Sequence, residues 1–175
     1  MRSWWIALVV AHAACVPEFK GQGQEEGGFE VGRIVPDVGL PDQAGEPVSL
    51  RDFDGSVVLL DISTMWCAPC QELATHAEAT FADYEPDGFM YITVLQEDVE
   101  GGVPKQPDLQ RWADSFSITT PVLADGGPPE ERTTGPAIVN GQFPAILVIG
   151  RDGSVVERVG ATDDASVREA IERAL

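Results

Sequence analysis

One stretch of the sequence decides the fold: residues 57–70, which read VVLLDISTMWCAPC. Its first part is apolar on consecutive positions, which is typical of a strand covered on both faces of a sheet. Its end holds Cys67 and Cys70, separated by two residues, and a helical pattern follows over residues 68–84. Two cysteines at such a strand-to-helix junction can form and break a disulfide reversibly.

The position of Cys67 favours a reactive sulfur. A thiol at a helix N-terminus faces unpaired backbone N–H groups and the positive end of the helix dipole. Both favour the thiolate, which is the reactive form. A free cysteine has a pKa of about 8.5, and Cys-X-X-Cys motifs lower this value to roughly 3.5–7.5. The motif therefore predicts thiol–disulfide exchange.

Length and composition limit the classes of protein to consider. The chain has 175 residues, about one domain, and 43% of them are hydrophobic, which is enough for a core. The formal net charge is -18. Nucleic acid and anionic lipid both attract basic surfaces, so this charge argues against either as a partner. It indicates an acidic, self-repelling surface and identifies no partner.

Residues 1–14 are interpreted as an export signal. Arg2 supplies a minimal positive region, and the apolar run over residues 4–11 is too short to span a bilayer. The motif AHA of residues 11–13 fits ordinary signal peptidase, and an uncleaved anchor is a further alternative. The motif AAC of residues 13–15 resembles the end of a bacterial lipoprotein box and would make Cys15 the lipidated first residue. Lipidation would also remove the odd thiol among three cysteines.

The rest of the chain divides into a linker and one domain. Residues 15–34 contain glycine, glutamine and glutamate in alternation and predict a lipid-anchored or flexible linker. Residues 35–175 hold the alternating strand and helix patterns of the domain, with Gly45 in a hairpin turn. Residues 126–141 are rich in glycine and proline and match no element. The predicted strands are 48–50, 57–63, 89–95, 121–123, 145–149 and 155–159, and the predicted helices are 68–84, 107–116 and 163–175.

This order of elements resembles the thioredoxin superfamily, and in particular its exported TlpA/ResA-like members. The resemblance covers about residues 35–175 and rests on Asp61, the WCAPC motif of residues 66–70, Phe143-Pro144, and the terminal hairpin with its helix. It implies an α/β fold, a thioredoxin-like three-layer sandwich. A central mixed sheet would be flanked by helices, with an N-terminal hairpin extension.

The resemblance also implies roles for individual residues. Cys67 would be the attacking nucleophile and Cys70 the buried resolving thiol of a redox disulfide. Trp66 would cover the edge of the site, although an aromatic residue at a strand end can also simply fill core. Pro144 matches the cis proline that faces the cysteines, and Phe143 before it would offer backbone groups to a bound polypeptide.

Asp61 is the third candidate catalytic residue. Its apolar neighbours place it on a buried strand, and burial raises the pKa of a carboxyl group. An acid of this kind near Cys70 could accept its proton. Thioredoxins carry an aspartate here, whereas TlpA/ResA-like proteins usually have a glutamate three residues after the second cysteine, where this chain has Leu73. The alternative is an aspartate that meets solvent or caps a backbone group at the strand end.

Other functions stay open from the sequence. A thiol peroxidase would carry P-x-x-x-T-x-x-C, and Thr64 fits this pattern but Leu60 does not. A metal-binding domain would need a third ligand beside Cys67 and Cys70, and His76 lies about 180° around the same helix from Cys67. A non-catalytic domain with an inert disulfide is the third alternative. We expect no metal and no cofactor.

The expected protein is an exported thiol–disulfide oxidoreductase of the periplasm or cell envelope, bound to the membrane only through a lipid anchor. Its partners would be disulfide-bearing or dithiol proteins of the envelope and an upstream membrane electron donor. Ala68-Pro69 adds no charge between the cysteines. This favours a reductant with a potential nearer to thioredoxin's, about -270 mV, than to DsbA's, about -120 mV.

Overall fold

The structure is a computed structural model and describes residues 27–175. The predicted export signal, the candidate lipidation site Cys15 and the first part of the predicted linker lie outside the described residues. Within the described part, no helix is both long and apolar enough to cross a membrane. The strands are β1 (Gly39–Pro41), β2 (Pro47–Ser49), β3 (Val57–Ser63), β4 (Phe89–Leu95), β5 (Val122–Ala124), β6 (Ala145–Ile149) and β7 (Val155–Val159), and the α-helices are α1 (Ala68–Tyr84), α2 (Gln106–Phe116) and α3 (Asp164–Ala174).

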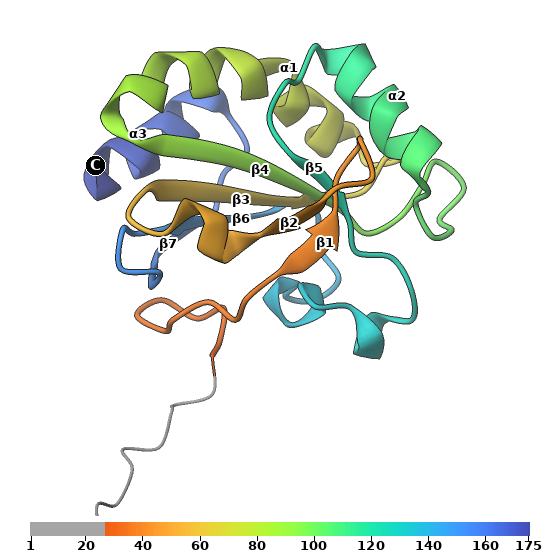
Figure 1. Cartoon of the computed structure of the whole chain (residues 1–175), viewed down its shortest axis with the longest axis horizontal. Helices are drawn as coiled ribbons and strands as arrows, with labels where there is room; N and C mark the ends of the chain where they lie inside the picture. The colour runs from red at the N-terminus through yellow and green to blue at the C-terminus, as the bar shows by residue number, and fades with distance from the viewer. Residues whose placement is uncertain (1–26) are drawn as a thin grey trace, which may run out of the picture.

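Five strands form a mixed sheet in the order β5-β4-β3-β6-β7. The β3–β4 and β4–β5 pairs are parallel, whereas β6 is antiparallel to both β3 and β7. All seven residues of the central strand β3 are buried, as its apolar run predicts. The β1–β2 hairpin forms a separate small sheet (Figure 1). These features confirm the predicted thioredoxin-like fold with its N-terminal hairpin.

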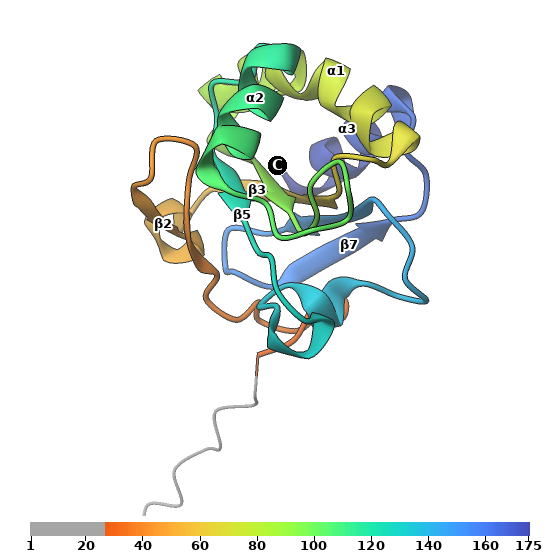
Figure 2. The same cartoon turned by 90° about the vertical axis from the view of Figure 1, so that its right-hand side faces the viewer.

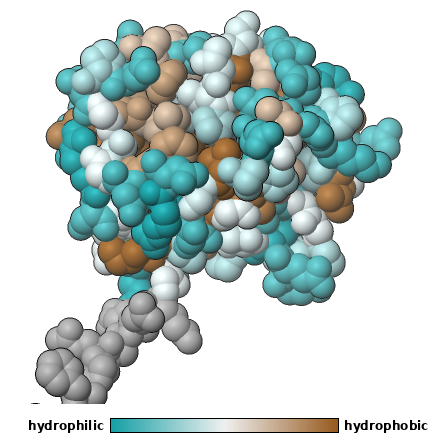
Figure 3. All heavy atoms as spheres, viewed as in Figure 1, coloured by the Kyte–Doolittle hydropathy of each residue, from teal (hydrophilic) through white to brown (hydrophobic). Residues whose placement is uncertain are grey.

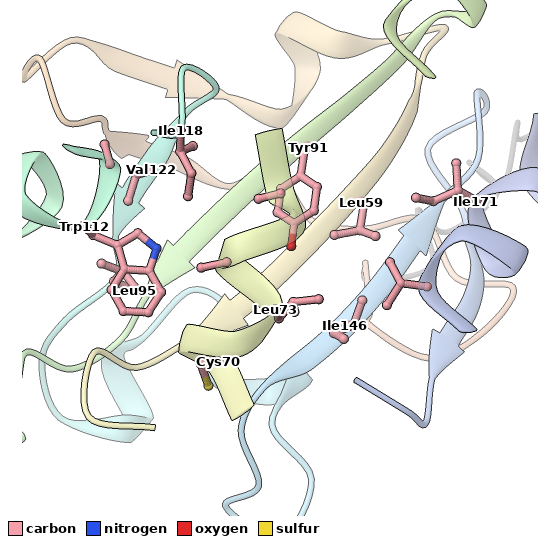
Figure 4. Close-up of a cluster of buried hydrophobic side chains, with 14 of the residues drawn as sticks. Leu59, Cys70, Leu73, Tyr91, Leu95, Trp112, Ile118, Val122, Ile146 and Ile171 are labelled. Carbon is pink, nitrogen blue, oxygen red and sulfur yellow. The ribbon is translucent and has the colours of Figure 1, made fainter. Parts of the chain in front are cut away.

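The three helices pack on one face of the sheet. Alternate residues of each strand point to this face, and they meet apolar residues of α1, α2 and α3 in one cluster. Figure 4 shows Leu59 and Tyr91 from the sheet beside Leu73 of α1 and Ile171 of α3. Cys70 belongs to the same cluster, so the core reaches the predicted redox site.

The opposite face is covered by the N-terminal segment and by part of the chain after β5. Phe29, Val38 and Leu50 pack there against β3, β6 and β7, together with Ala137. Phe29 belongs to the predicted linker, and it is only 4% exposed. A single aromatic residue among glycines and glutamates gives no periodic signal that would reveal this packing.

Most predicted elements agree with the structure, and the differences are small. β3, β4, α1, β6 and β7 have the predicted bounds, α2 begins one residue early at Gln106, and β5 is shifted by one residue. Gly45 lies in the first hairpin turn with a φ of 85°, which favours glycine. The unassigned residues 126–141 hold two short 3-10 helices, Pro129–Glu131 and Gly135–Ala137.

The surface carries both hydrophilic and hydrophobic residues. On the face shown in Figure 3, hydrophilic residues dominate, and hydrophobic residues form separate patches.

Figure 2 looks onto the end of the sheet at which β3 and β4 end, next to the start of α1. Parallel strands bring their carboxyl ends to one edge, and ligands commonly bind at this edge in α/β sheets. The predicted site lies there.

Candidate functional site

Cys67 and Cys70 form a disulfide at the first turn of α1. Cys67 is the N-cap residue, with extended backbone angles, and the N–H of Cys70 points at its sulfur across 3.4 Å. The sulfur thus occupies the place that a serine or aspartate oxygen takes at other helix starts. Pro69 lies in the first turn, where a missing N–H removes no helical hydrogen bond.

The two cysteines differ in exposure. Cys67 is 5% exposed and Cys70 is fully buried, although both belong to the cluster under α1, in which Figure 4 labels Cys70. A polypeptide that approaches this end of the sheet therefore reaches Cys67 first. The sulfur of Cys67 lies 3.6 Å from the carbonyl oxygen of Phe143.

Phe143, Pro144 and Trp66 surround the disulfide. The peptide bond between Phe143 and Pro144 is cis, as the resemblance implies. Trp66 is half exposed, and its ring meets that of Phe143 edge to face with centroids 6.2 Å apart. Trp66 therefore lies at the rim and does not fill core. A cleft of about 280 Å³ opens beside Pro144, with Val139 and Val159 in its lining.

Glu97 holds the Trp66 side chain in place at the rim of the site, and no sequence pattern predicts this role. The indole N–H of Trp66 donates to one carboxylate oxygen of Glu97 at 2.8 Å. The other oxygen accepts from the guanidinium of Arg132 at 3.2 Å. Arg132 also donates to the side-chain oxygen of Gln96 and to the carbonyl of Gly127. Trp66 is thus connected to the loop after β5.

The same loop is held by Asp125. Its carboxylate accepts from the backbone N–H groups of Thr133 and Thr134, and also from the Thr134 hydroxyl. Gln96 donates to that hydroxyl oxygen at 2.8 Å. These contacts order residues 125–134 beside the redox site. They are side-chain contacts without a helical or strand repeat, so no local sequence pattern indicates them.

Asp61 lies in the helix-facing layer of the sheet. It is fully buried on β3, and strand alternation puts it on the same face as Leu59, in the layer that contains Cys70. Its oxygens accept hydrogen bonds from the hydroxyls of Ser63, at 2.6 Å, and Tyr91, at 3.3 Å. Burial raises the pKa of Asp61 to about 7, and the two hydroxyl donors oppose this rise.

The predicted residues thus differ in exposure. Trp66 is exposed, Phe143 and Pro144 are partly exposed, and Cys67, Cys70 and Asp61 are buried. In the disulfide form, no hydrogen bond among the described residues joins Asp61 to Cys70. Tyr91 and Ser63, the partners of Asp61, were missed because their roles depend on strand register and side-chain direction.

The alternative metal ligand does not approach the cysteines. His76 lies on the exposed side of α1, with its nearest charged partner Glu72 at 3.9 Å. Across residues 27–175, no group of three or more His, Cys, Asp or Glu side chains could hold a metal ion.

Comparisons with known proteins agree with this geometry. The chain is 23% identical over 154 residues to the thiol-disulfide oxidoreductase ResA of Bacillus cereus, covering 88% of this chain and 83% of that protein. It is 26% identical over 134 residues to ResA of Halalkalibacterium halodurans, covering 76% and 70%.

Solved structures show the same fold. The thioredoxin domain of a thiol-disulfide oxidoreductase from Bacteroides vulgatus superposes with a TM-score of 0.68 at 20% identity, covering 82% of this chain and 96% of that one. A thiol:disulfide interchange protein from Bacteroides sp. gives a TM-score of 0.66 at 20% identity, covering 83% and 90%.

Residues 31–158 match the AhpC/TSA family, and this segment includes both cysteines, Asp61 and the cis proline. The relatives place the chain among thioredoxin-like thiol–disulfide oxidoreductases. The chain belongs to the AhpC/TSA family.

Proposed function

We propose that this protein is an exported reductant of protein disulfides, with Cys67 as the attacking thiol and Cys70 as the resolving thiol. One observation carries the proposal: Cys67 caps α1 with its sulfur facing the Cys70 N–H and keeps some exposure, whereas Cys70 is buried. The capping position favours the thiolate, and the difference in burial decides which thiol a partner reaches first.

The reaction proceeds in two exchanges. The Cys67 thiolate of the reduced protein attacks one sulfur of a partner disulfide, and the other partner sulfur leaves and takes up a proton. Cys70 then loses its proton and attacks Cys67. The Cys67–Cys70 disulfide forms, and the second partner sulfur leaves. Two electrons have passed to the partner, and this protein is oxidised.

Asp61 takes up the proton that Cys70 loses. Its carboxyl titrates near neutral pH, because burial raises its pKa to about 7, so the ionised form is available as a base under working conditions. Asp61→Asn removes the base and keeps the shape of the side chain. We expect the mixed disulfide on Cys67 to accumulate in this variant, while the first attack proceeds. Equal resolution rates in the variant and the parent would rule out this role.

The partner polypeptide binds across Trp66, Phe143 and Pro144. The Phe143 carbonyl beside the Cys67 sulfur provides an acceptor for a backbone N–H of the partner, and the rings of Trp66 and Phe143 give apolar contact. The partners are disulfide-bearing proteins of the cell envelope, and an upstream membrane donor restores the dithiol. Cys15 carries the lipid anchor, and the linker of residues 15–34 connects this anchor to the domain.

Insulin reduction tests the proposed activity, with dithiothreitol as the electron donor. The parent protein accelerates precipitation of the insulin B chain, whereas Cys67→Ser abolishes this acceleration and Cys70→Ser leaves a trapped mixed disulfide. Glu100→Gln, an exposed change on the loop after β4, serves as the matched control and retains activity. Full activity in Cys67→Ser contradicts the assignment. Peroxide consumption without insulin reduction favours a thiol peroxidase instead.

A further inference from the structure

A buried polar cluster lies under the disulfide, on the helix-facing side of β3 and β4. It contains Asp61 and Ser63 from β3 and Tyr91 and Thr93 from β4, each at most 1% exposed. In the parallel pairing of these strands, Asp61 lies opposite Thr93, and Leu59 lies opposite Tyr91. Tyr91 lies two residues before Thr93 on the same face of β4, and its long side chain reaches the Asp61 carboxyl group from there.

Each oxygen of the Asp61 carboxyl has one hydroxyl donor. Ser63 donates to Oδ1 at 2.6 Å, and Tyr91 donates to Oδ2 at 3.3 Å. Donors of this kind stabilise the ionised carboxyl more than the protonated one. The pKa of Tyr91 is raised well above its ordinary value by burial first and by Asp61 next, so its hydroxyl keeps its proton and stays a donor.

Thr93 shows that proximity alone does not give this contact. Thr93 lies opposite Asp61 in the pairing of β3 and β4, yet its buried hydroxyl oxygen has no hydrogen-bond partner among the described residues. The carboxyl is held by Tyr91 and Ser63. A threonine at this register position thus provides an internal comparison for the effect of a donated hydrogen bond.

Few charges act on this cluster. From α3, Asp164 acts on Tyr91 through its charge and is itself paired with Arg168 at 2.9 Å. The buried residues of α1 are Cys70, Leu73, Ala74, Ala77 and Thr80, and of these only Cys70 becomes titratable once the disulfide is reduced. From β6, the residue opposite Asp61 is the apolar Ile146. The two hydroxyls are thus the polar groups that oppose the desolvation of Asp61.

We infer that Tyr91 is a positioning residue of the exchange reaction, whose hydroxyl orients the Asp61 carboxyl and keeps it ionised in the pH range in which it takes the Cys70 proton. This inference rests on the proposed role of Asp61. The aromatic ring of Tyr91 packs in the core (Figure 4), so Tyr91→Phe removes the hydroxyl and retains the packing.

Two readouts test the inference on the full-length protein. The first is the titration of the Asp61 carboxyl carbon in the oxidised protein, followed by NMR. The second is the pH dependence of resolution, measured as release of thionitrobenzoate from a mixed disulfide on Cys67. The variants are Tyr91→Phe and Ser63→Ala, with Thr93→Val as the matched control for loss of a buried hydroxyl from the same layer.

We expect the midpoints of both profiles to move upward by about one pH unit in Tyr91→Phe, because a hydrogen bond to a charged group is worth about that much. At a pH below the midpoint, Tyr91→Phe releases thionitrobenzoate roughly tenfold more slowly than the parent protein. Ser63→Ala moves both midpoints in the same direction, and Thr93→Val leaves them in place. An unchanged Asp61 titration in Tyr91→Phe overturns the inference, whatever the exchange activity. If the Asp61 titration shifts in Tyr91→Phe but the release of thionitrobenzoate is unchanged in both Tyr91→Phe and Asp61→Asn, the proposed base role of Asp61 is overturned instead.

Discussion

The backbone N–H of Cys70 points at the sulfur of Cys67 across 3.4 Å, so one cysteine of the disulfide caps the helix that contains the other. After reduction, the same N–H and the helix dipole act on the Cys67 sulfur at the start of the helix, whereas Cys70 lies within the first turn and is fully buried. The two thiols of one motif therefore occupy different electrostatic environments.

This difference predicts the order in which the thiols react. Pulse alkylation of the reduced protein with iodoacetamide between pH 5 and pH 9 modifies Cys67 first at every pH. Mass spectrometry of the digested protein identifies the site, and Cys70→Ser supplies the reference for Cys67 alone. Preferential modification of Cys70 would reverse the assignment of nucleophile and resolving thiol.

The buried Asp61 predicts a pH-dependent stability difference between the parent and Asp61→Asn. The folded pKa is about 7 and the ordinary value is 3.8, so folding favours the protonated form. Below the ordinary value both states are protonated, and burial of the charge costs nothing. As the pH rises through this interval, the parent loses stability relative to Asp61→Asn, up to roughly 4 kcal/mol at 1.36 kcal/mol per pKa unit.

Urea unfolding of both oxidised proteins at pH 4, 6 and 8 measures this difference. The free energy of unfolding of Asp61→Asn, relative to the parent, rises with pH and levels off above neutrality. Other carboxyl groups titrate equally in both proteins and cancel in the comparison. A difference that is constant across the three pH values contradicts a carboxyl whose pKa is raised by burial.

Glu97 predicts a structural effect at the rim of the site. Arg132 is 10% exposed at its side chain, so Glu97→Gln leaves its buried charge without the carboxylate partner. We expect the free energy of unfolding to fall by about 1–3 kcal/mol. Glu100→Gln on the same loop is the control and changes it by less than about 0.5 kcal/mol. Equal stability of the two variants would show that the Trp66–Glu97–Arg132 contacts do not hold the loop.

The proposed lipid anchor predicts how the chain is processed in a bacterium. The mature protein begins at Cys15, partitions into detergent, and gains the mass of a diacylglyceryl group. Cys15→Ser releases the protein or blocks its processing, and Cys67→Ser leaves the anchor unaffected. A soluble mature protein that begins at Ala14 would support ordinary signal peptidase.

The elements predicted most accurately are those in which the local pattern of apolar residues matches the residues that the fold buries. β3 and β4 are mostly apolar because both faces of the sheet are covered, and α1 ends where Pro86 and Gly88 follow. The cis bond before Pro144 came only from the resemblance, since cis bonds are a small minority before proline.

The rest depends on side-chain contacts that leave no periodic pattern in the sequence. Residues 126–141 are ordered by Asp125 and Arg132 through side chain–backbone bonds that no periodicity encodes. The partners of Asp61 depend on the register of β3 and β4, which places Tyr91 within reach. The sequence predicts a buried acid near the cysteines, but strand pairing determines which hydroxyls hold it.

The reduction potential of the Cys67–Cys70 couple decides whether this protein reduces or oxidises its partners. Equilibrium with dithiothreitol redox buffers, quenched with acid and followed by alkylation, gives the oxidised fraction. We expect one reversible two-electron transition nearer to about -270 mV than to about -120 mV. A disulfide that does not exchange contradicts thiol–disulfide chemistry, and a potential near the upper value contradicts the proposed reductant.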